Sequence, residues 1–180
     1  MSSSPLQDLK VIDLSTVLAG PSVGTFFAEL GARVIKVEHP QHGDITNTWR
    51  LKQESDLFKQ SAYYASVNHK KELVKLNLGL AADYRIFLNE LKDADILLMN
   101  FKKGDDQKLK VTPTELWKIK PDLLIGEITG FGSDNDRIAY DLILQAESGF
   151  MSMNGTAESG PVKMPVALID VLAAHQLKEG

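Results

Sequence analysis

Residues 11–40, VIDLSTVLAGPSVGTFFAELGARVIKVEHP, decide the fold of this chain. They comprise an apolar run, a Gly-Pro pair, a segment with helical spacing and a second apolar run. This order predicts a β-α-β unit, in which a helix joins two parallel strands. The glycines do not follow the G-x-G-x-x-G spacing of dinucleotide-binding turns, so we do not expect the unit to bind NAD or FAD.

Glycines are expected to bound the helix of this unit. We expect Gly20 to cap its start, with Pro21 in the first turn, where proline is tolerated. Gly31 is expected to end it in the left-handed conformation. Apolar residues recur at helical spacing between these points, at Val23, Phe26, Phe27 and Leu30.

The rest of the chain continues to alternate between strand and helix patterns. The predicted strands are 9–14, 33–37, 72–78, 95–99 and 122–128. Further helices are predicted at 56–67, 81–92, 113–118 and 141–151, and from 168 onward. Such alternation implies right-handed crossovers, so the expected fold is α/β, a Rossmann-like parallel sheet with helices on both faces.

Composition and charge exclude several classes of function. The length of 180 residues and the hydrophobic share of 43% are typical of one globular domain. The net charge of −4 is unsuited to binding nucleic acid, whose phosphates need a basic surface. Cysteine is absent, which excludes disulfides, thiolate metal sites and a cysteine nucleophile. We expect no metal. The start lacks a signal-peptide pattern and no apolar run approaches a membrane span, so we expect no membrane partner and a cytoplasmic location.

Ligands of open parallel sheets bind beyond the carboxyl ends of the strands. The segments that follow predicted strands are 15–21, 38–40, 100–104 and 129–132. Basic groups gather modestly in and near these segments, at Lys70, Lys71, Lys102, Lys103 and Lys108. Free helix N–H groups with nearby lysines suit a phosphate-bearing ligand. Taken one at a time, each glycine also fits a plain turn and each lysine a solvated surface group.

Seven stretches in order resemble one family. They are DLSTVLAGP, AELGARVIKVEHPQHGD, NHKKELVKLNL, ADILLMNFKKG, ITGFG, YDLILQAESGFMSMNG and PVALIDVLAAHQ. Together they resemble the class III CoA-transferases, which include formyl-CoA and carnitine-CoA transferases and the α-methylacyl-CoA racemases. The resemblance covers nearly the whole chain and corresponds to the N-terminal portion of that family. It implies that the β-α-β unit binds the adenosine end of coenzyme A.

The resemblance also implies which residues contact coenzyme A. Leu18 and Ala19 would present backbone groups to the base, and His39 falls where the family often has an arginine near the nucleotide. Five further positions match residues that line the path of the cofactor, namely Lys71, Asn100, Phe101, Lys108 and Leu109. From its residue type alone, Phe101 fits a core aromatic at a strand end equally well.

Asp170 matches the nucleophilic aspartate of the family. The resemblance implies that its carboxylate attacks an acyl-CoA thioester, and that an aspartyl-CoA thioester forms and is opened by an acceptor carboxylic acid. From the residues alone, Asp170 fits a helix N-cap equally well. Tyr140 stands where the racemases have a histidine that moves a proton. Tyrosine is a poor base at neutral pH, which favours CoA transfer over racemisation, although a partly buried core tyrosine remains an alternative.

Length is the main departure from the family, whose members continue into a small second domain and a returning segment that this sequence lacks. We therefore interpret residues 1–180 as a single CoA-binding α/β domain. Two functions stay open: an active CoA-transferase with acyl-CoA and carboxylic acid substrates, and a non-catalytic or truncated domain that binds CoA or self-associates. We expect a homodimer with residues 141–180 at its interface, because uncovered apolar surface favours association.

Overall fold

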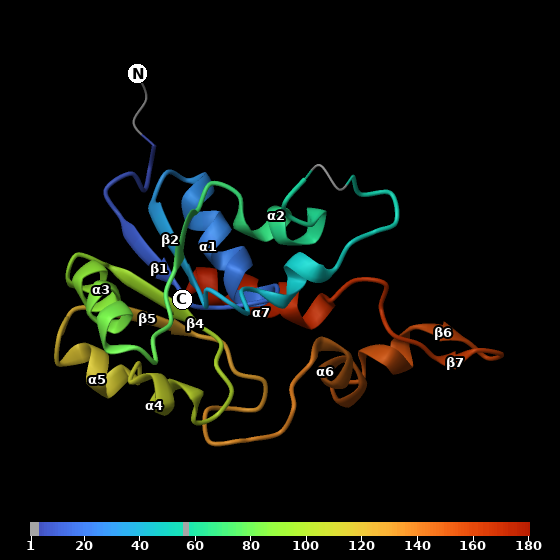
Figure 1. Cartoon of the computed structure of the whole chain (residues 1–180). Helices are drawn as coiled ribbons and strands as arrows, with labels where there is room; N and C mark the ends of the chain where they lie inside the picture. Colours follow the sequence, from blue (N-terminus) through green and yellow to red (C-terminus); the bar gives the residue numbers. More distant parts are fainter. Residues whose placement is uncertain (1–3, 56–57) are drawn as a thin grey trace.

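A five-stranded parallel sheet forms the centre of the computed structural model, which describes residues 4–55 and 58–180 (Figure 1). The strand order is β3-β2-β1-β4-β5, and every neighbouring pair is parallel. The strands are β1 (Lys10–Asp13), β2 (Arg33–Glu38), β3 (Glu72–Lys75), β4 (Ile96–Met99) and β5 (Leu124–Glu127). The predicted Rossmann-like sheet is confirmed.

Helices cover both faces of this sheet (Figure 1). The helices in the described ranges are α1 (Ala19–Glu29), α2 (Ala62–Asn68), α3 (Ala81–Lys92), α4 (Asp105–Leu109), α5 (Pro113–Trp117), α6 (Asp141–Glu147) and α7 (Leu168–Glu179). Two 3-10 turns, η1 (Ile45–Thr48) and η2 (Phe150–Met153), and a hairpin of β6 (Gly155–Thr156) and β7 (Gly160–Pro161) complete the elements. No helix in the described ranges is long and apolar enough to cross a membrane.

The pleat of β1 divides the core into two layers. Val11 belongs to a buried cluster with Val23 of α1 and Ala174 of α7. Ile12 belongs to a second cluster on the opposite face, with Phe87 of α3. Successive side chains of a strand point to opposite faces, so two adjacent apolar residues serve two helical layers. Burying each such side chain fully contributes about 1.5–3 kcal/mol relative to leaving it exposed.

The start of α1 differs from the sequence expectation. Leu18 is the N-cap and the helix begins at Ala19, so Gly20 lies inside the first turn and does not cap it. A Cβ added at Gly20 would stand 2.3 Å from the Cβ of Ser15, so glycine is needed for a close approach. The expectation for Gly31 is confirmed, since it follows the helix with a φ of +100°.

Two further helix boundaries depend on local caps that the periodicity did not reveal. Helix α2 begins at Ala62 because the Ser61 side chain accepts a hydrogen bond from the third residue of the helix, whereas the helix was expected from Asp56, which lies outside the described residues. Helix α6 ends at Glu147, four residues early, and Gly149 follows with a φ of +86°. Neither α4 nor the β6–β7 hairpin was expected.

Candidate functional site

The order of the strands places a candidate site beside β1. The chain winds outward from β1 in both directions, so the switch point lies between the carboxyl ends of β1 and β4. Asn100, just beyond β4, accepts a hydrogen bond from the backbone N–H of Thr16 at 2.9 Å. Its amide donates to the Thr16 carbonyl at 2.8 Å. The segments that follow the two strands therefore meet at one sheet edge, as the sequence predicted.

The loop between β1 and α1 is held residue by residue. The backbone N–H of Ser15 donates to Asp13 at 3.0 Å, and the Ser15 carbonyl accepts from Lys36. The backbone N–H of Val17 donates to Asp44 at 3.0 Å. Val17 has a φ of 73°, a conformation that is costly for a β-branched residue. Side chains from three other segments thus impose a turn that the loop sequence alone disfavours.

Four buried charges lie beneath this loop. Lys36 lies 3.7 Å from Asp44, and Lys71 lies 2.8 Å from Asp13, with all four side chains at most 1% exposed. Burial raises the pKa of the Asp13 carboxyl, but the charges of Lys36 and Lys71 outweigh it and hold the pKa below its ordinary value. A Cβ added at Gly24 of α1 would stand 2.8 Å from Asp13 and 3.0 Å from Lys71, so glycine lets the helix cover the pair.

Lys71, one of the predicted contacts, has a buried and fully paired side chain. Its ammonium group is within hydrogen-bonding distance of Asp13, the carbonyls of Pro21 and Val67, and Asn68, at 2.8–3.1 Å. Burial lowers the pKa of Lys71, and Asp13 opposes this effect. Because an ammonium has three protons to donate and these four acceptors surround it, none is left for a phosphate. Lys71 is therefore a buried structural group in this fold.

The other predicted contacts vary in exposure. The ring of His39 is half-buried, accepts backbone hydrogen bonds through Nδ1 and stacks on His42 at a centroid distance of 4.6 Å. Phe101 and Leu109 are half-buried and pack against the core cluster between the sheet and α3, which supports the core alternative for Phe101. Lys108 is exposed and pairs with Asp105 at 2.8 Å.

Asp170 lies in the first turn of α7. The N-cap of that helix is Ala167, so the alternative interpretation of Asp170 as a cap is wrong. The acceptor at the helix start is instead Asp141 of α6, whose Oδ1 accepts from the backbone N–H groups of Ile169 at 2.8 Å and Asp170 at 3.4 Å. Burial and, to a lesser extent, the charge of Asp141 raise the pKa of Asp170 to about 6.

Two tyrosines are associated with this region. Tyr140, directly before α6, is 65% exposed, which excludes the alternative of a core tyrosine. Tyr63 of α2 was not predicted from the sequence. Burial raises the pKa of Tyr63, and the charge of Asp170 is the next cause. Tyr63 therefore lies within the electrostatic reach of Asp170, a relationship between distant segments that no local pattern indicates.

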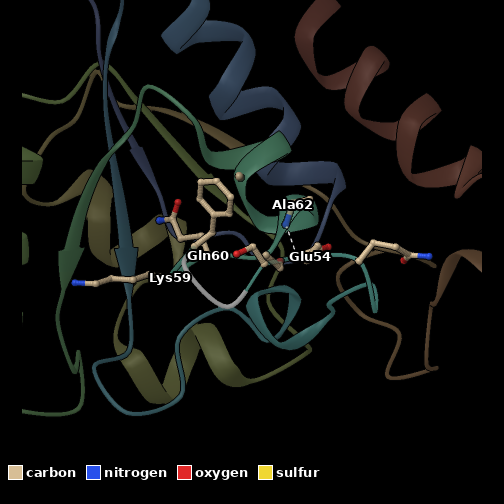
Figure 2. Close-up of a pocket in the computed structure, with 9 residues that line it drawn as sticks. Glu54, Lys59, Gln60 and Ala62 are labelled. Carbon is tan, nitrogen blue, oxygen red and sulfur yellow. Dashed lines mark hydrogen bonds between the residues drawn. The ribbon is translucent and has the colours of Figure 1, made fainter.

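Two surface hollows lie between α2 and the loop before it. The larger, of about 650 Å³, runs beside Gln53–Ser55, Phe58–Ala62 and Ala65, and Figure 2 shows Glu54 reaching the backbone N–H of Ala62 across it. The smaller, of about 340 Å³, is lined by Trp49 and Tyr63 among others. Within the described chain, neither lining includes a residue predicted from the sequence. Tyr63 lines the smaller hollow and interacts electrostatically with Asp170.

Comparisons with known proteins agree with one another. The family model described as CoA-transferase family III matches residues 6–178. The acetyl-CoA:oxalate CoA-transferase of Acetobacter aceti is 40% identical over 163 residues, which are 89% of this chain and 41% of that protein. The succinate–glutarate CoA-transferase of Agrobacterium fabrum is 35% identical over 173 residues, covering 93% and 43%.

The solved structures show the same relationship. A CAIB/BAIF family protein from Brucella suis superposes with a TM-score of 0.87 and 31% sequence identity. The match covers 99% of this chain and 49% of that protein. The chain thus spans slightly less than half the length of the relatives it matches.

Proposed function

Because the chain belongs to CoA-transferase family III, we propose that it exchanges coenzyme A between carboxylic acids, with Asp170 as the nucleophile. The carboxylate environment of Asp170 carries this proposal: the residue is held in the first turn of α7, and its pKa is raised to about 6. Such a carboxylate is mostly ionised at neutral pH and is more basic than an ordinary aspartate, which suits attack on a carbonyl.

The reaction divides one difficult exchange into easier steps. A carboxylate oxygen of Asp170 attacks the thioester carbonyl of acyl-CoA, the C–S bond breaks, and a mixed anhydride and CoA thiolate form. The thiolate attacks the aspartyl carbonyl and releases the donor acid, which leaves an aspartyl-CoA thioester. The acceptor carboxylate opens this thioester to a second anhydride, and the thiolate takes the new acyl group. Asp170 then regains its carboxylate.

The loop at the carboxyl end of β1 is proposed to hold the adenosine end of the cofactor. Leu18 and Ala19 would contact the base through their backbone. The hydrogen bonds that Asp44 accepts from the Val17 N–H and Asn100 accepts from the Thr16 N–H support a fixed loop. His39 and Lys108 would lie toward the phosphates, and Phe101 and Leu109 would line the path. Lys71 contributes from beneath, by pairing with Asp13.

Tyr140 is proposed to donate a hydrogen bond to an acyl or thioester oxygen. Its exposure of 65% leaves its hydroxyl free to approach a ligand. Tyrosine offers a hydroxyl that can donate a hydrogen bond, at the position where the racemases have a histidine that moves a proton. This favours transfer over racemisation.

We keep a second candidate function beside the first. This candidate is a domain that binds CoA, or associates with itself, without turnover. Homodimerisation is compatible with both candidates. It is supported by large apolar side chains exposed on and beside α6 and α7, namely Tyr140, Leu142, Met153, Val166, Val171 and Leu172.

Intact-mass spectrometry after incubation with acetyl-CoA or succinyl-CoA tests the proposal. The expected result is a mass gain of one CoA less one water, which is absent from Asp170→Asn and retained by Asp136→Asn, a matched change in an exposed loop. A chain that binds CoA by calorimetry but gains no mass would favour the non-catalytic candidate. A mass gain that persists in Asp170→Asn would contradict the assignment of the nucleophile.

A further inference from the structure

The first turn of α7 obtains its acceptor from another helix. Helix α7 begins at Leu168, and its N-cap, Ala167, has no side chain that could accept a hydrogen bond. The first backbone N–H groups of a helix have no partner within the helix. Here Asp141, the first residue of α6, accepts from Ile169 at 2.8 Å and from Asp170 at 3.4 Å. One carboxylate oxygen 29 positions away therefore fixes the turn that carries Asp170.

The carboxylate of Asp141 is itself fixed. Its second oxygen, Oδ2, accepts from the side-chain amide of Gln145 at 2.6 Å. Gln145 is 1% exposed, and it also donates to the Val166 carbonyl at 3.1 Å and accepts from the Met164 N–H at 2.8 Å. Both ends of the amide are thus used to tie the segment before α7 to α6. The pair of Asp141 and Gln145 forms a rigid connection between the two helices.

We propose that Asp141 is a positioning residue for Asp170, which fixes the place of its side chain and keeps a second negative charge beside it. The inference rests on the proposed function only in treating Asp170 as the nucleophile. The two roles reside in one carboxylate: Oδ1 holds the start of α7 through hydrogen bonds while Oδ2 is held by Gln145, and the charge acts on Asp170 through space. An asparagine at position 141 would keep an acceptor oxygen and lose the charge.

Asp170 interacts electrostatically with groups on two other helices. The pKa of Asp170 is raised first by burial and second by the charge of Asp141, on α6. The pKa of Tyr63, on α2, is raised first by burial and second by the charge of Asp170. Burial and an anionic neighbour leave Asp170 more basic than an isolated aspartate. Greater basicity favours nucleophilic attack, provided that the group stays ionised at the working pH.

The titration of the Asp170 carboxyl, followed by carbon NMR in the unliganded full chain, tests this inference. We expect about half of the Asp170 side chains to be protonated at pH 6 in the wild type, because the pKa is about 6. In Asp141→Asn the midpoint should move to lower pH without loss of thermal stability. Asp136→Asn removes one carboxylate charge from the exposed loop before α6 and should leave the midpoint unchanged.

A second readout separates positioning from charge. Asp141→Ala loses the acceptor as well as the charge, so the rate of covalent adduct formation should fall by about tenfold to a hundredfold, whereas Asp141→Asn should retain most of it. An unchanged midpoint in Asp141→Asn would overturn the inference, as would an Asp141→Ala variant that reacts as fast as the wild type. The titration needs no cofactor, so a shifted midpoint in a chain that forms no adduct would refute the proposed function and leave this inference supported.

Discussion

Val17 donates its backbone N–H to the buried carboxylate of Asp44 at 3.0 Å, across 27 positions of sequence. The contact holds a β-branched residue at a φ of 73°, in the loop where dinucleotide-binding folds use glycine. Glycine adopts such a conformation without steric cost, whereas here tertiary hydrogen bonds impose it. Asp44 is fixed in turn by Thr46 and lies near Lys36, so the loop is shaped by a buried polar network.

Replacing Val17 should separate stability from affinity. Val17→Asn should raise the free energy of unfolding by about 1 kcal/mol, because asparagine tolerates positive φ, and CoA affinity should be retained. Val17→Gly also removes the strain but restores flexibility, so CoA affinity should fall without a matching loss of stability. Urea denaturation and calorimetry measure the two quantities. A Val17→Asn variant less stable than the wild type would refute the assignment of strain.

Asp170 should make stability depend on pH in a defined window. Its pKa in the folded chain, about 6, is above the ordinary value of 3.8, so the folded state holds the proton more tightly than the unfolded state. Stability is therefore lost as pH rises from about 4 to about 6. Asp170→Asn should match the wild type in melting temperature near pH 4 and exceed it at pH 7. Equal melting temperatures at both pH values would contradict the raised pKa.

Replacing Lys71 should lower the stability of the fold, and the loss should not depend on salt concentration. Lys71→Met leaves the Asp13 carboxylate buried without its partner, which should cost about 3–5 kcal/mol of unfolding free energy. The double variant Lys71→Met with Asp13→Asn should recover part of this loss, because the unpaired charge is removed. Urea denaturation at two salt concentrations checks the prediction. A loss that disappears at high salt would indicate an exposed contact instead.

Replacing Lys108 should affect CoA binding in a salt-dependent way and leave stability almost unchanged. Its side chain is 76% exposed and pairs only with the nearby Asp105 among the residues described, so Lys108→Ala should leave stability almost unchanged. If Lys108 faces a phosphate of CoA, the variant should weaken binding several-fold at low salt. The difference should vanish near 1 M salt, where the screening length is about 3 Å. Calorimetry at the two salt concentrations measures it, and a salt-independent effect would argue against a phosphate contact.

Self-association should involve the helix that carries Asp170. Val171 and Leu172 of α7 are 39% and 43% exposed, and exposed apolar groups of this kind favour a two-fold contact. Sedimentation at tens of micromolar should show a dimer, and Leu172→Glu should shift it toward the monomer. Ile86→Glu, on α3, is the control for a change at another exposed apolar side chain. A wild-type monomer would refute the prediction.

The sequence by itself determined the layered fold and the family. Apolar runs at Val11–Leu14 and Arg33–Val37, with helical spacing between them, predict a β-α-β unit because strand and helix periods differ. These patterns are local, so they can be recognised from neighbouring residues without knowledge of the tertiary contacts. The motifs around Leu18, Asn100 and Asp170 carried the family resemblance because each is a short continuous stretch of sequence.

Only the tertiary structure decided which polar groups are buried together. Lys71 and Lys108 were both predicted to contact the ligand, yet one is sealed beneath α1 with Asp13 and the other is exposed. Asp141 stands at the start of a predicted helix, yet it also holds the first turn of another helix. Burial and pairing depend on which segments the sheet brings together, so the environment of a charge, and hence its pKa and its role, is fixed by packing between distant residues.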